Sequence, residues 1–96
     1  MTLSSKFKDK LLPPEKRIES IRKRIDSVDE SIIELLIVRK ELSSEIIRVK
    51  KNIGLDAENL NRETEIKRKL SALSGDGLNP ELIGKIYNLI FEDAKK

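Results

Sequence analysis

Apolar residues recur along the first half of the chain at alternating steps of three and four positions. The row runs from Ile18 to Ile53, and Arg39 is its single charged member. This spacing, with a period of about 3.5 residues, is typical of a long helix that packs against other helices. The apolar members are Ile18, Ile21, Ile25, Val28, Ile32, Leu35, Leu42, Ile46, Val49 and Ile53.

Signals for both ends of this helix lie outside the row. Pro13 and Pro14 followed by Glu15 are typical of a first turn, where an acid faces the positive end of the helix dipole. No further proline or glycine occurs until Gly54. We therefore predict one helix from about Pro14 to about Asn52.

Two shorter helices are predicted downstream. Asp56 or Asn59 can cap a second helix that ends at about Leu73. Asn79-Pro80-Glu81 is a strong start for a third helix, which continues through Ile90. The row of the second helix that we expect to face inward is Asn59, Glu63, Ile66, Leu70 and Leu73. No strand pattern occurs, so the predicted fold class is all-α.

The long helix has more apolar surface than the short ones can cover. From Ile32 to Val38 it is apolar on nearly every side, which requires burial on more than one face. A homodimer satisfies this requirement if three helices from each chain, one long and two short, form an intertwined six-helix bundle. We expect residues 14–96 to form one helical domain, preceded by a flexible N-terminal segment, 1–13.

Composition excludes several kinds of chemistry. The 96 residues include no Cys and no His, so thiol and imidazole catalysis and the usual ligands of zinc or copper are absent. We predict no metal and no cofactor. The first residues lack the apolar core of a signal peptide, and no apolar run could cross a bilayer, so we expect a cytoplasmic protein without a membrane partner. The charge of +3 is too small and too dispersed to indicate nucleic acid.

Arg39 is the informative residue, because a lone cation in an apolar seam is costly unless an anion meets it. Lys50 follows three turns later on the same face, about 16 Å away along the helix, which leaves room between the two side chains for a small dianion. Arg22 precedes Arg39 by about 25 Å along a rigid helix. It can reach that gap only from the partner chain.

Structural explanations compete with this interpretation. Arg39 can equally fix the helix register or form an ion pair with Glu63. Taken singly, Arg22, Lys50 and Arg62 are ordinary solvated surface residues, and Asn59 is a helix cap. Their joint placement at both ends of one apolar cavity favours a binding site.

The sequence resembles the all-α chorismate mutases. The resemblance rests on an Arg at the helix start, an I-D-x-x-D run, an apolar block, R-x-x-L, a Lys eleven residues after that Arg, a G-L turn and an R-E pair, and it covers about Ile18 to Ile90. It implies rearrangement of chorismate to prephenate in the biosynthesis of Phe and Tyr, without a cofactor. The implied site joins Arg22 of one chain to residues of the other: Arg39, Lys50, Asn59, Arg62 and Glu63.

The resemblance also implies a role for each residue. The arginines hold the two carboxylates of chorismate, and Lys50 also approaches the ether oxygen, so Lys50 and Arg39 are the expected catalytic residues. Glu63 and the neighbouring Asn59, which stands where an Asp is common, bind the ring hydroxyl. Ala94 occupies the position of a hydroxyl residue in many members, and the Gln or Glu found one turn later has no counterpart before Lys96.

Two other functions remain open from the sequence. Isochorismate pyruvate lyase shares the fold and the site, although the G-L turn and the R-E pair favour the mutase. A non-catalytic helical dimer that binds a chorismate-like dianion belongs to a different class, and the missing C-terminal polar residue is its best support. Lys95 or Lys96 is a possible substitute for that residue, without a pattern that supports either one.

Overall fold

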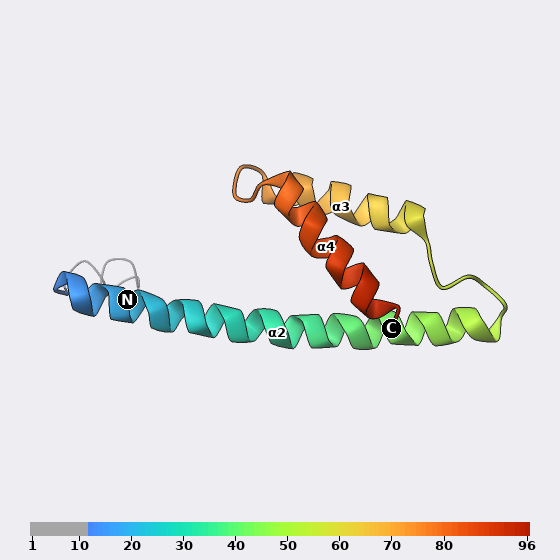
Figure 1. The fold of residues 1–96 in the computed structure, drawn as a ribbon, viewed down its shortest axis with the longest axis horizontal. Helices are drawn as coiled ribbons and strands as arrows, with labels where there is room; N and C mark the ends of the chain where they lie inside the picture. The colour runs from blue at the N-terminus through green and yellow to red at the C-terminus, as the bar shows by residue number, and fades with distance from the viewer. Residues whose placement is uncertain (1–11) are drawn as a thin grey trace, which may run out of the picture. The chain divides into compact units, whose positions relative to one another are not determined.

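The computed structural model describes residues 12–96, which form three α-helices and no strand (Figure 1). They are α2 (Pro14–Asn52), α3 (Leu60–Ser74) and α4 (Pro80–Ala94). The predicted all-α class and the three helices are confirmed. The predicted flexible segment 1–13 lies almost wholly outside the described residues. The chain divides into two compact units between Val38 and Arg39, and the single helical domain over residues 14–96 stays a prediction.

The first unit contains the N-terminal part of α2. The helix begins at Pro14 as predicted, with Glu15 in its first turn, and the amide of Arg17 donates to the carbonyl of Pro13 over 2.8 Å. The apolar row is exposed in the single chain, and Leu35 retains 68% of its accessible surface. The burial on more than one face that the sequence requires is therefore not supplied by the part of the chain that the structure describes.

The C-terminus of α2 ends in a Schellman motif. Gly54 adopts a φ of 75°, a left-handed conformation that favours glycine. Its amide donates to the carbonyl of Lys51, and the amide of Leu55 donates to the carbonyl of Lys50 over 2.7 Å, which is the bond pattern of that motif. The G-L turn of the sequence thus ends the helix and fixes Lys50 in its last turn.

Helix α3 begins at the second of the two predicted caps. Asn59 is the N-cap, and its Oδ1 accepts a hydrogen bond from the amide of Arg62 at 3.0 Å. Glu63, Ile66 and Leu70 are half-buried, as predicted for the inward row. Leu73 is 81% exposed in the single chain, and its burial against a second chain stays a prediction.

Helix α4 packs against α3 as a hairpin (Figure 1). Asn79 caps it by accepting from the amide of Glu81 at 2.8 Å, with Pro80 in the first turn, as predicted. Within residues 12–96 only Ile83 and Phe91, both on α4, are buried, at 5% and 6% exposure. No helix in the same range is long and apolar enough to cross a membrane.

Candidate active site

A pocket of about 180 Å³ lies within the second unit, between the C-terminal half of α2, the start of α3 and the end of α4. Its walls carry both apolar and charged side chains. The lining residues are Arg39, Ser43, Ile46, Ile47, Lys50, Ala57, Asn59, Arg62, Glu63, Ile66, Phe91, Ala94 and Lys95. The rim is open, since Asn59, Arg62 and Lys95 are solvent-exposed. Five of the six predicted site residues therefore line one pocket.

Arg39 is held by aromatic rings. Its guanidinium carbon lies 5.6 Å from the ring centroid of Tyr87 and 5.5 Å from that of Phe91, within the range of cation–π contacts. The two rings meet edge to face at 5.9 Å. Among residues 12–96, no carboxylate lies within ion-pair distance of Arg39, so the structural ion pair with Glu63 does not form. The rings position the guanidinium and leave its charge available to an anion.

Lys50 reaches the pocket from the last turn of α2. Its backbone carbonyl closes the Schellman motif, which fixes the start of the side chain. The residue is half-buried, and within residues 12–96 its ammonium forms no ion pair with a carboxylate. Lys50 and Arg39 therefore present two uncompensated cations to one cavity from the same helix face.

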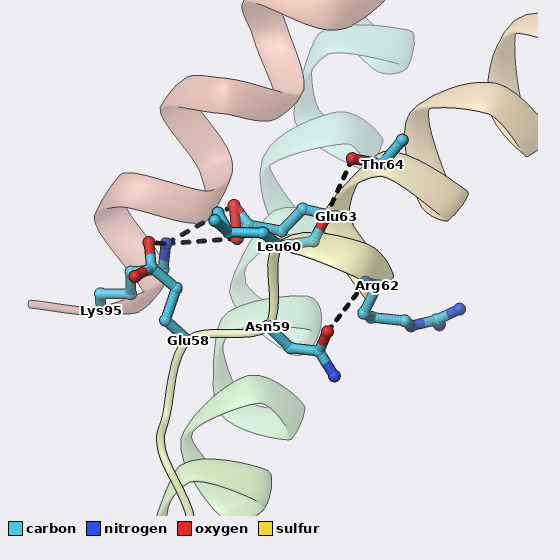
Figure 2. Close-up of polar contacts among 7 residues, drawn as sticks. All are labelled: Glu58, Asn59, Leu60, Arg62, Glu63, Thr64 and Lys95. Carbon is cyan, nitrogen blue, oxygen red and sulfur yellow. Dashed lines mark hydrogen bonds and ion pairs between the residues drawn. The ribbon is translucent and has the colours of Figure 1, made fainter.

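Asn59 and Arg62 stand together at the N-terminus of α3. The cap uses Oδ1 of Asn59, so its amide NH₂ remains able to donate. Figure 2 shows the side chain of Arg62 extending away from Glu63 and Lys95. Nη1 of Arg62 contacts Glu65 at 3.3 Å, an exposed pair that contributes little free energy. An anion in the pocket therefore competes easily for this guanidinium.

Glu63 pairs with Lys95, a contact that the sequence analysis did not predict. Nζ of Lys95 lies 3.3 Å from Oε2 of Glu63 and 3.1 Å from Oε1 of Glu58 (Figure 2). The hydrogen bond to Glu58 and the contacts with Glu63 raise the pKa of Lys95, although desolvation lowers it. The ammonium is therefore charged throughout the neutral range. The four-residue spacing of Ile83, Tyr87, Phe91 and Lys95 was the available signal in the sequence.

Arg22, the sixth predicted site residue, lies on α2 in the first unit and is exposed. It was predicted to act from a partner chain, which a single chain does not test. Its role stays a prediction.

The pocket suits a small anion with an apolar body. Four cations line it, Arg39, Lys50, Arg62 and Lys95, against one acid, Glu63, so positive charge predominates. The apolar part of the wall consists of Ile46, Ile47, Ala57, Ile66, Phe91 and Ala94. Fixed cations together with a hydrogen-bonding carboxylate can orient a dianion and stabilise negative charge that develops on it.

Comparisons with known proteins agree with this geometry. The family described as chorismate mutase type II matches residues 21–96. The chain is 29% identical to a chorismate mutase of Methanocaldococcus jannaschii over 80 residues, which cover 82% of this chain and 81% of that protein.

Solved structures give the same result. Form I of the chorismate mutase of Thermus thermophilus is similar with a TM-score of 0.77 and 33% identity, covering 81% of this chain and 98% of that one. Form II has the same TM-score and identity and is covered over 89% of its length. The family match spans most of the long helix, the pocket and both short helices, and so this chain belongs to the chorismate mutase type II family.

Proposed function

We propose that the protein rearranges chorismate to prephenate, a step in the biosynthesis of Phe and Tyr, and that it does so as a homodimer. The observation that carries the proposal is the convergence of Arg39, Lys50 and Arg62 on one pocket with Glu63 at its side. The family match and the two Thermus structures support the same activity. A cytoplasmic location is part of the proposal and rests on the sequence pattern alone.

The pocket complements the chemical groups of the substrate. Chorismate carries two carboxylates, a ring hydroxyl and an ether oxygen that joins the ring to an enolpyruvyl arm. In the proposed complex, Arg39 binds one carboxylate of chorismate. Arg62 turns away from Glu65 and binds the other carboxylate. Glu63 accepts the hydrogen bond of the ring hydroxyl, and the free NH₂ of Asn59 donates to the same group.

The reaction needs no nucleophile and no proton transfer. The ether C–O bond breaks as a C–C bond forms between the arm and the ring, in one cyclic movement of electrons. Holding the arm over the ring lowers the activation free energy, because the entropic cost of orienting the arm has already been met on binding. Negative charge grows on the ether oxygen in the transition state, and the ammonium of Lys50 stabilises it in place of water. Lys50 and Arg39 are therefore the proposed catalytic residues.

The homodimer is proposed because one chain leaves its apolar row uncovered. Only two residues among 12–96 are buried, whereas the row on α2 is exposed along its length. A second copy of the chain, with the same row, can cover it by packing the long helices together. Arg22 of the second copy would then complete each pocket, which gives two equal sites per dimer.

The test is the ultraviolet assay of chorismate loss with the product identified. We expect prephenate as the product. The variant Lys50→Ala should lower kcat by about 10²–10³, the usual cost of removing one preorganised donor at a developing charge.

Lys51→Ala is the matched control. It removes the same charge from the adjacent position, outside the pocket, and should retain wild-type kinetics. Release of pyruvate from isochorismate in place of prephenate from chorismate would identify a lyase. Equal losses in Lys50→Ala and Lys51→Ala would refute the assigned role of Lys50.

A further inference from the structure

Lys95 is the one cation of the pocket to which the proposed mechanism gives no role. It lies at the C-cap of α4, one turn after the buried Phe91, on the side of the helix that faces α2 and α3. Its side chain is 36% exposed. A solvated lysine would extend from the helix end into water. The position of this side chain in the lining of the pocket therefore requires a partner.

That partner is the carboxylate of Glu63. Nζ of Lys95 lies 3.3 Å from one oxygen of Glu63 and 3.5 Å from the other (Figure 2). Within residues 12–96, Lys95 is the only group that bonds this carboxylate, whose side chain is 18% exposed. Two contacts on one side fix the plane of the carboxylate and leave further lone pairs for another donor.

Glu58 holds Lys95 from the opposite side. Its Oε1 lies 3.1 Å from Nζ, and it belongs to the α2–α3 connection that also supplies Ala57 to the pocket wall. Two carboxylates from two segments therefore set the position of one ammonium. With both partners bound, Lys95 faces Glu63 and is not a free donor aimed at the centre of the cavity.

We propose that Lys95 is a positioning residue: it holds the carboxylate of Glu63 in the orientation that accepts the ring hydroxyl of the substrate and offsets its charge beside a dianion. Without this ammonium, the carboxylate of Glu63 would rotate freely and repel the carboxylates of the substrate. The inference rests on the function proposed above for the pocket. It assigns to Lys95 a part in substrate binding through Glu63.

Steady-state kinetics with chorismate test this role. Lys95→Met keeps the length of the side chain and removes the ammonium, and it should lower kcat/KM by about fivefold, mainly through KM. Lys95→Arg should restore most of the loss. Lys40→Met is the matched control, because Lys40 also forms an ion pair with a neighbouring segment, to Asp93 of α4 at 3.0 Å, but lies outside the pocket. It removes the same charge and should leave KM unchanged.

The background variant Glu63→Ala separates positioning from direct binding. If Lys95 acts through Glu63, adding Lys95→Met to Glu63→Ala causes no further loss, and circular dichroism shows the helices of each variant intact. An undiminished loss in that background, or equal kinetics of Lys95→Met and Lys40→Met, overturns the inference while leaving the proposed function in place. A wild-type protein without chorismate turnover overturns both.

Discussion

At the scale of single residues, the most informative finding is how Arg39 is held. The sequence marked it as a cation within an apolar row and left an ion pair, a register device and ligand binding as alternatives. The structure places it against Tyr87 and Phe91. Ring faces attract a planar guanidinium without cancelling its charge, whereas a carboxylate would compete with any anionic ligand. This environment favours the binding alternative.

Arg39→Lys should therefore impair activity although the charge is kept. An ammonium has neither the planar face nor the paired donors of guanidinium, and we expect kcat/KM to fall by more than about tenfold. Arg48→Lys is the control, since Arg48 lies on an exposed part of α2 outside the pocket. Equal kinetics of the two variants would show that the ring contacts have no catalytic consequence.

At the scale of elements, the sequence predicted what local chemistry decides. The start of α2 at Pro14, its end before Gly54 and the cap at Asn79 depend on residues within one turn, and all three were predicted correctly. The exposure of Leu73 and the contact of Lys95 with Glu63 depend on which segment packs nearby. Periodicity assigns a face to such residues, but it does not identify the neighbour that meets that face.

Two glycine substitutions test the role of the turn after α2. Gly54→Ala should lower the free energy of unfolding by about 1 kcal/mol, because its φ of 75° is strained for alanine even though nothing crowds a Cβ there. It should also reduce turnover, because Lys50 takes part in the same motif. Gly84→Ala, inside α4 with open space around it, should raise stability by about 0.5–1 kcal/mol. Urea denaturation measures the free energy of unfolding of each variant. Changes of the same sign in the two variants would contradict the different backbone roles given to Gly54 and Gly84.

At the scale of the whole molecule, the single chain leaves two things unprovided: cover for the apolar row of α2, and one of the six predicted residues of the proposed site. A chain of 96 residues buries a limited share of its surface, and here the apolar row of α2 has no cover within the described residues. The pocket of one chain likewise offers five of the six predicted site residues, all except Arg22. In the proposed homodimer a second copy would meet both needs at once, and assembly and catalysis should then be inseparable.

Complementation between two inactive variants tests this assembly. If Arg22 acts across the interface, a mixture of Arg22→Ala and Lys50→Ala chains forms heterodimers in which one site has both native residues and the other has neither. Half of the dimers in an equal mixture are heterodimers, so about one quarter of wild-type activity should return after unfolding and refolding together.

The control replaces the second partner by the double variant Arg22→Ala/Lys50→Ala, whose heterodimers contain no native site and should stay inactive. A return of one quarter of the wild-type activity distinguishes shared sites from sites built within one chain, because in the latter case every site of the first mixture keeps one defect. If the mixture of Arg22→Ala and Lys50→Ala chains is no more active than the mean of the two separate variants, Arg22 does not act across the interface. The proposed homodimer would then rest only on the uncovered apolar row of α2, and no longer on a shared active site.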